Sequence, residues 1–363
     1  LIGMNELAQQ LGEKINGSTG SGSGNGGTGG KTEPETVPYL PSDDFHYDTS
    51  TSVDTGLIIA DSNGNEYVWV VVPRTTAVYK TTGLEKTTFT DADYTSIEKD
   101  LKDYTSTYVT TSGYSDTYVA DDKNVGWFAD EKAYNNLKNS MLKSVYENGG
   151  FYVGRYEAGI AENRTSNTEK NSDEKYTIEG MPTPVTKADA YPYTYVTRTQ
   201  AQNLASNVNS GTKTSSLMFG VQWDLVLAFM SKDTAKITST DVLTKNSTTI
   251  GNYNDNLWTI KNANAQYLSS GKFVQCPNPF KKESSSAKLL TTGADSSFSV
   301  QNIYDIAGNV WEWTLEKTSY TNVPCAYRGG FFLSTGSNFP AAYRIYNSTD
   351  RSDNDVGFRV SLF

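Results

Sequence analysis

Cysteine and histidine, the side chains that most often carry redox or acid–base chemistry, are scarce in this chain. Its 363 residues include only Cys276, Cys325 and His46. Two cysteines are too few for a disulfide framework or a four-ligand zinc site. They could form one disulfide or lie buried as two thiols, and the sequence leaves both alternatives open. A histidine-based triad would depend on His46 alone, in a polar segment. The pattern disfavours catalysis, and we expect no catalytic residues.

The residues best suited to bind a partner lie between glycine-containing blocks near the C-terminus. Residues 302–314 (NIYDIAGNVWEWT) and Arg328-Gly-Gly330 precede a window, residues 331–355, and Asp355-Val-Gly-Phe-Arg-Val360 closes it. Aromatic side chains supply contact area with few torsions to restrict, and short polar side chains supply adaptable hydrogen bonds, as in an antibody paratope. The alternative is an ordinary surface loop with some buried aromatics. The candidate ligand-binding residues are Phe331, Phe332, Leu333, Ser334, Thr335, Asn338, Phe339, Tyr343, Ile345, Tyr346, Asn347, Asp350, Arg351, Asp353 and Asn354.

Large side chains in the flanking blocks have a different expected role. Trp311, Trp313 and Phe358 are expected in the core, because large aromatic residues are usually buried. Arg328 and Arg359 belong to the same blocks, so we expect structural roles for them too.

Composition limits the class of protein and of partner. Apolar residues make up 36% of the chain, with 24 Tyr and 6 Trp, which is typical of a β-rich and loop-rich protein. The formal net charge of −10 argues against nucleic acid and against an anionic membrane surface as partners. No apolar run is long enough to span a bilayer. The chain begins at Leu1, so we expect that it was processed or trimmed and that a signal or anchor segment preceded it.

The N-terminal region predicts a tether. Residues 1–16 place apolar side chains at helical spacing, so we expect an amphipathic helical stub that packs on a partner or continues a longer helix. A frayed terminus is the alternative. Residues 17–41 are rich in Gly and Ser and are expected to form a flexible linker. A fusion tag would have the same pattern.

The remaining residues, 42–363, predict one large α+β domain without a second hydrophobic core. A hairpin is expected over 56–73, a strand over 151–158, and short strands and loops over 231–297. Helices are expected over 91–104, 130–148, 198–206 and 218–230, the last one buried.

The order of these elements and motifs resembles the formylglycine-generating enzyme (sulfatase-modifying factor) family. The resemblance rests on Phe151-Tyr-Val-Gly-Arg-Tyr-Glu157, the helix at 198–206, the Trp223 helix, Gly308-Asn-Val-Trp-Glu-Trp313, Arg328-Gly-Gly330 and Gly357-Phe-Arg359. It covers roughly residues 54–363. It implies a C-type-lectin-like fold, with long loops and a few helices around small antiparallel sheets.

The same resemblance bears on catalysis and on metals. The family's enzymes oxidise a substrate cysteine with a cysteine pair shortly after Arg-Gly-Gly, and the matching positions here are Ser334 and Phe339. These side chains cannot bind copper or do thiol chemistry, so we expect no copper. By the family's match, a structural Ca²⁺ would be held by Asp305, the carbonyl groups of Gly308 and Val310, and Glu312. A tight turn without an ion is the alternative.

The window also resembles that of lectin-fold proteins diversified by retroelements. There, adenine-directed mutagenesis varies a stretch between a Gly-Gly motif and a terminal Gly-Phe-Arg, and cannot produce Lys, Glu, Gln, Met or Trp from Asn-type codons. Residues 331–355 contain none of these five, although Lys and Glu are common elsewhere.

Together these features predict a non-catalytic, extracellular protein whose C-terminal surface binds a protein or glycan on another cell or particle. A bacterial surface protein, a pilus-tip adhesin and a phage receptor-binding protein all fit, and the N-terminal helix would serve tethering or assembly. The alternatives are a formylglycine-generating-type oxidase and a structural pilus or filament subunit.

Overall fold

The computed structural model describes residues 37–119, 127–167 and 172–363. The expected N-terminal helix and residues 17–36 of the expected linker lie outside these ranges. Residues 37–41 were also expected in the linker, but Tyr39 packs edge-on against Trp69 and Tyr152, with ring centroids 5.5 Å away in both cases. The end of that segment therefore belongs to the domain.

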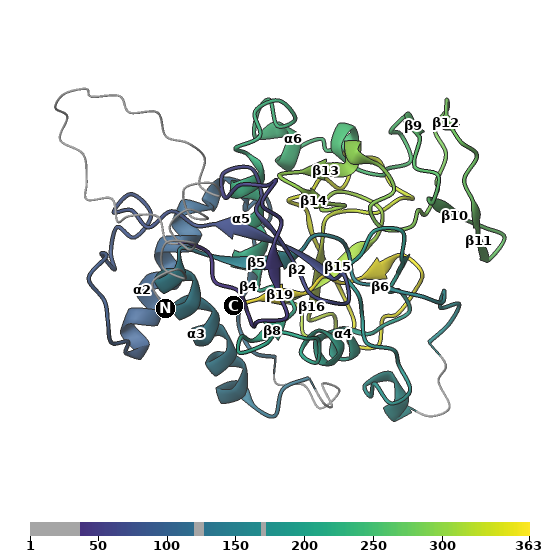
Figure 1. The fold of residues 1–363 in the computed structure, drawn as a ribbon. Coiled ribbons are helices and arrows are strands. Elements are labelled where there is room, and N and C mark those ends of the chain that lie inside the picture. The colour runs from purple at the N-terminus through teal and green to yellow at the C-terminus, as the bar shows by residue number, and fades with distance from the viewer. Residues whose placement is uncertain (1–36, 120–126, 168–171) are drawn as a thin grey trace, which may run out of the picture.

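Two sheets, one antiparallel and one mixed, form the framework (Figure 1). The larger has the order β1-β2-β3-β5-β19-β8, so the C-terminal strand β19 lies in its interior beside β5. Its strands are β1 (His46–Tyr47), β2 (Ile58–Ala60), β3 (Glu66–Val71), β5 (Gly150–Gly154), β8 (Ser215–Ser216) and β19 (Ser361–Leu362). The predicted hairpin is confirmed by β2 and β3.

The second sheet carries the C-terminal blocks. Its order is β17-β16-β15-β18, and β4 pairs with the end of β15. All its pairs are antiparallel except β15 with β18. The strands are β4 (Tyr114–Ser115), β15 (Trp311–Thr318), β16 (Cys325–Arg328), β17 (Arg344–Asn347) and β18 (Val356–Gly357).

Helices connect and cover these sheets, close to where the sequence predicts them. Thr90 caps α2 with a capping box, Asp130 caps α3, and Gly149 ends α3 at a left-handed φ of 71°. The helices are α2 (Asp91–Tyr104), α3 (Glu131–Asn148), α4 (Arg198–Ala205), α5 (Gly220–Met230) and α6 (Asp241–Thr244). In the part of the chain that the structure describes, four 3-10 helices lie at Ser106–Tyr108, Ser172–Lys175, Thr248–Ile250 and Ser296–Phe298. Within the described residues, no helix is long and apolar enough to cross a membrane.

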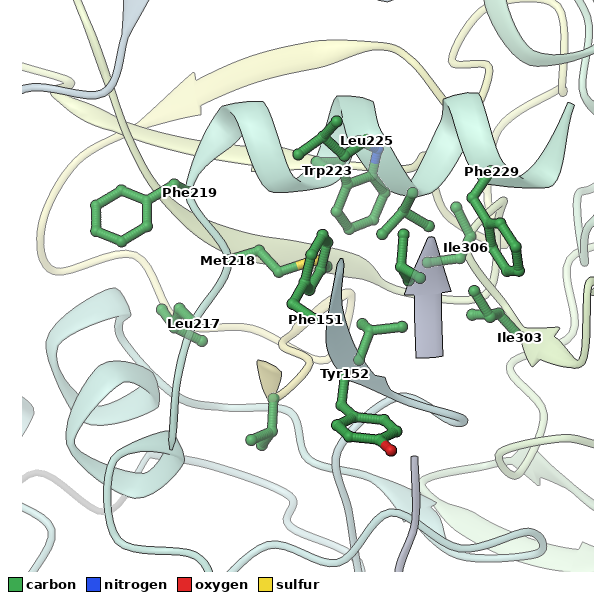
Figure 2. Packing of buried hydrophobic residues seen from close by; sticks show 14 of the residues in the cluster. Phe151, Tyr152, Leu217, Met218, Phe219, Trp223, Leu225, Phe229, Ile303 and Ile306 are labelled. Atoms are coloured by element: carbon green, nitrogen blue, oxygen red, sulfur yellow. The ribbon is translucent and has the colours of Figure 1, made fainter. Parts of the chain in front are cut away.

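Helix α5 is the centre of the main core, because every one of its residues is buried. It contacts β3 of the larger sheet and β15 of the second sheet, so it joins the two. Figure 2 shows Trp223 and Phe229 of this helix directed toward Phe151 and Ile306. The buried helix expected over 218–230 is confirmed, and Trp311, Trp313 and Phe358 lie in the core as predicted, each at most 2% exposed.

Residues 231–297 form short strands and loops, as expected, together with α6 and the 3-10 helix Thr248–Ile250, which were not predicted. The prediction of a single core was wrong. A satellite cluster around Trp258, Ile260 and Phe298 lies outside the main core. It forms because aromatic side chains from the paired strands β9–β12 and β10–β11 pack against one another. The remaining strands are β6 (Gly159–Ile160), β7 (Tyr191–Pro192), β9 (Trp258–Ile260), β10 (Gln266–Ser269), β11 (Lys272–Gln275), β12 (Phe280–Lys282), β13 (Ser299–Val300) and β14 (Ile303–Tyr304).

Candidate functional site

The backbone of the window, residues 331–355, is held mainly by groups outside it. Main-chain hydrogen bonds connect both its first half and its last residues to segments outside the window. They run from Phe332 N to Asn309 O, Asn254 N to Ser334 O, Ser247 N to Gly336 O, Ala342 N to Leu243 O, Tyr195 N to Asp353 O and Trp311 N to Asp355 O. Strand β17 adds its pairing with β16. Because these bonds involve only backbone atoms, they do not depend on which side chains the window carries.

One buried tyrosine closes the first loop of the window. The hydroxyl group of Tyr253 lies 3.0 Å from the carbonyl oxygen of Gly329 and 2.8 Å from that of Phe339, and donates its hydrogen between them. Burial raises the pKa of Tyr253, so the phenol keeps this hydrogen. Gly330 has a φ of 80°, and a Cβ atom there would lie 2.3 Å from the Phe339 oxygen. The loop can close this tightly only over glycine.

A buried network of four charged side chains holds the second half. Arg344 of the window and Arg328 of β16 face Asp224 of α5 and Glu316 of β15, and all four are at most 4% exposed. Arg328 lies 2.7 Å from Asp224, Arg344 lies 3.1 Å from Glu316, and Arg344 also pairs with Asp224. Two positive and two negative charges balance, as buried charges require. Arg344 therefore belongs to the framework, although it lies inside the window.

Three aromatic side chains of the window pack around Trp311 and remain half-buried. The ring of Phe331 stacks on Trp311 with centroids 5.5 Å apart, and Phe339 lies 5.1 Å from it. Tyr343 lies 4.8 Å from Phe339. The rings of Phe331, Phe339 and Tyr343 keep part of their area in contact with solvent, so they form an aromatic cluster at the surface.

Further apolar groups of the window are more exposed. Leu333 is 50% exposed and Tyr346 is 40% exposed. The ring of Tyr346 lies 4.9 Å from that of Tyr320, which is 57% exposed. Tyr320 was not among the predicted binding residues because it precedes the window. Side chains of this kind, exposed beside a packed cluster, are typical of a contact surface.

The last part of the window is polar. Arg351 pairs with Asp353 at 2.9 Å and with Asp355 at 2.8 Å, while Asp350 is exposed. Asn347 donates to the hydroxyl group of Tyr327 at 3.3 Å. These groups supply both hydrogen-bond donors and acceptors beside the apolar side chains.

The predicted binding residues lie at the surface, with one correction. All of them are exposed or half-buried except Phe332, which is 6% exposed and packs against Leu289 and Val310. Phe332 cannot touch a ligand because its ring fills a small apolar cluster instead. Besides Arg344, five further window residues are buried: Gly336, Pro340, Ala341, Ala342 and Thr349. A Cβ atom on Gly336 would lie 2.1 Å from the backbone nitrogen of Thr248.

The two cysteines are separate buried thiols. Cys325 lies in β16 and Cys276 in the satellite cluster, and they form no disulfide. Of the two alternatives left open by the sequence, the structure therefore shows two buried thiols and not a disulfide. Burial raises the pKa of Cys276 to about 11, so its reactive thiolate form is scarce at neutral pH. His46, in edge strand β1, is exposed.

The expected calcium ligands do not fit the ion as they are arranged. Arg359 donates to both carboxylate oxygens of Glu312, at 2.6 and 3.0 Å, so a guanidinium group already occupies the place of the cation. Asp305 accepts a hydrogen bond from the backbone nitrogen of Gly293 at 2.8 Å. Burial raises the pKa of both carboxyl groups. Within the described ranges, no three His, Cys, Asp or Glu side chains are grouped to hold a metal.

Comparison with known proteins identifies the family. Residues 48–362 match the sulfatase-modifying factor enzyme 1-like domain. The chain belongs to this family. Its fold is accordingly the C-type-lectin-like fold of the formylglycine-generating enzyme type, as the motif order predicted.

Two solved structures illustrate the range of similar chains. Variable protein 1 of Treponema denticola has a TM-score of 0.31 and 15% identity, over 59% of this chain and 84% of that chain. The protein CarF has a TM-score of 0.32 and 14% identity, over 69% of this chain and 95% of that chain. No curated protein matches the chain.

Substituting Tyr253→Phe tests how the first loop is held. The variant loses the hydrogen bonds to Gly329 and Phe339 and leaves two buried carbonyl groups without this donor, so we expect a loss of about 1–3 kcal/mol in the free energy of unfolding. Amide hydrogens between residues 331 and 339 should exchange faster with deuterium. The control is Tyr346→Phe, which removes an exposed hydroxyl group and should change neither quantity. Equal exchange in the two variants would contradict the role of Tyr253.

Calcium removal tests the metal expectation. Because the guanidinium group of Arg359 is already bonded to the carboxylate of Glu312, we expect no effect of calcium on stability. The midpoint of thermal unfolding should be the same in a calcium chelator and in millimolar calcium. Calorimetry in both buffers measures it. A higher midpoint with calcium, beyond the shift produced by magnesium, would show that the ion binds the folded chain and displaces or rearranges the guanidinium group.

Proposed function

We propose that this protein is a non-catalytic ligand-binding protein whose window side chains recognise a protein or glycan. One observation carries the proposal: the window backbone is bonded to groups outside the window, while most of its side chains remain available to a ligand. An exposed leucine and tyrosine beside a half-buried aromatic cluster give such a surface apolar anchors, and the neighbouring Asn, Asp and Ser residues give it polar contacts.

Diversification by a retroelement is part of the proposal. The absence of Lys, Glu, Gln, Met and Trp from residues 331–355 supports it. The separation into buried and accessible positions also supports it, because buried positions such as Phe332, Gly336, Ala341, Ala342 and Arg344 can stay constant while the accessible ones change. Sequences of the same locus from related isolates should differ at the accessible positions and agree at these five.

The setting of this function is proposed on the sequence alone. The Gly/Ser-rich stretch that precedes the domain would act as a flexible linker. The expected N-terminal helix would serve tethering or assembly. Such an arrangement suits a bacterial cell surface, a pilus tip or a phage particle. The partner would lie on another cell or particle.

Truncation of accessible anchors tests the binding surface. Leu333→Ala and Tyr346→Ala should leave stability nearly unchanged, because both side chains are exposed. Each should weaken binding to the ligand found on a glycan and surface-protein array, by about 1–2 kcal/mol or about 5- to 30-fold. The control, Tyr94→Ala on α2, should bind like the parent protein. Unchanged binding by both window variants would refute the surface.

The two alternatives make different predictions. An oxidase of the formylglycine-generating type should convert a cysteine-containing peptide with copper and oxygen. Ser334 and Phe339, and the burial of both cysteines, lead us to expect no turnover. A structural subunit should assemble through its N-terminal residues while every window variant keeps full partner binding.

A further inference from the structure

The segment 256–290, here called the basic arm, differs in charge from the rest of the chain. It contains Lys261, Lys272, Lys281, Lys282 and Lys288 against a single acidic residue, Glu283, a net charge of +4 in a chain of net charge −10. Strands β9 to β12 form the arm, and they lie at the edge of the molecule away from α2 and α3 (Figure 1). The acidic net charge of the whole chain conceals this local excess of lysine.

Three of these lysines are exposed, and none of them forms an ion pair within the described residues. Lys281 pairs across the strands with Thr259, and both face solvent. Lys261 lies two residues beyond Thr259, and therefore on the same face. Lys272 lies at the start of β11, beside the hairpin turn. Among the ion pairs of the described residues, none includes Lys261, Lys272 or Lys281.

Lys282 fixes the arm to the domain. Lys282 is 5% exposed and donates to the carbonyl oxygens of Tyr253 at 2.6 Å, Ser286 at 3.0 Å and Asn254 at 3.1 Å. Tyr253 and Asn254 are the residues that hold the first loop of the window. The arm and the window are therefore anchored to the same short segment.

The arm also packs directly against the window. Leu268 of β10 and Phe273 of β11 join the apolar cluster of Phe332, which includes the half-buried ring of Phe331. Phe331 belongs to the aromatic cluster around Trp311. Apolar contact surface and exposed positive charge thus adjoin without an intervening element.

We propose that the basic arm extends the binding surface and that the partner is a protein with an acidic patch beside its contact region. This inference rests on the proposed function, because it assigns the arm and the window to one partner. A protein is favoured over an acidic polysaccharide because Leu333, Ile345 and the aromatic cluster offer apolar contacts, which suit a protein interface. Unpaired lysines at the rim speed encounter with an acidic partner and orient it.

Poly-L-glutamate is the probe for the arm, because it offers carboxylate charge on a polypeptide without a folded contact surface. We expect the full chain to bind it at low ionic strength in a titration followed by calorimetry. The double variant Lys272→Glu/Lys281→Glu should bind at least about tenfold more weakly, and added salt should weaken the parent's binding because charges are screened beyond about 10 Å at 0.1 M. The matched control is Lys132→Glu/Lys143→Glu on α3, which changes the net charge equally and should bind like the parent.

The outcomes separate the arm from the window. Tyr346→Ala should bind poly-L-glutamate like the parent, so failure of the window to bind an array ligand does not affect the arm's result. No binding of the probe, or equal weakening by the two charge-reversed variants, would overturn the arm as an anionic docking site. Tighter, equally arm-dependent binding of polygalacturonate would overturn the assignment to a protein and favour an acidic polysaccharide.

Discussion

Four charged side chains that have almost no contact with water connect the principal parts of this fold. Arg328, Arg344, Asp224 and Glu316 come from β16, β17, α5 and β15. Removing one partner from such a network leaves an uncompensated buried charge, at a cost of about 3–5 kcal/mol. The network therefore requires that β17 stay beside β16 and that both stay over α5. The first loop of the window is closed separately, through Tyr253.

The contacts that hold the window are therefore largely separate from the side chains that it exposes. The framework holds the window through backbone hydrogen bonds, one tyrosine, and a few buried window residues such as Phe332 and Arg344. The accessible side chains, including Leu333 and Tyr346, contribute little to that support. A surface built in this way can present different side chains without losing its shape, which is what a diversified binding protein requires.

The sequence predicted those parts of the fold whose signals are local. The bounds of α2 and α3, the apolar run of α5 and the Gly-Asn-Val-Trp-Glu-Trp block each depend on a short stretch, so the sequence alone could predict them. The site residues that were missed depend on contacts between distant segments. Tyr253 bonds to Gly329 and Phe339, and Arg359 pairs with the expected calcium ligand Glu312. Tyr320, between β15 and β16, contacts Tyr346 of β17. Only the assembled sheet places these groups together.

The central claim is that the framework, and not the accessible side chains, determines the shape of the window. Its most direct test is a library in which Phe331, Leu333, Ser334, Phe339, Tyr343 and Tyr346 are varied together, with the folded fraction scored by protease resistance. We predict that most members fold, whereas a matched library at six buried positions, Phe332, Gly336, Pro340, Ala341, Ala342 and Arg344, yields mostly unfolded chains. Equal losses in the two libraries would contradict the account, because the accessible side chains would then be part of the framework.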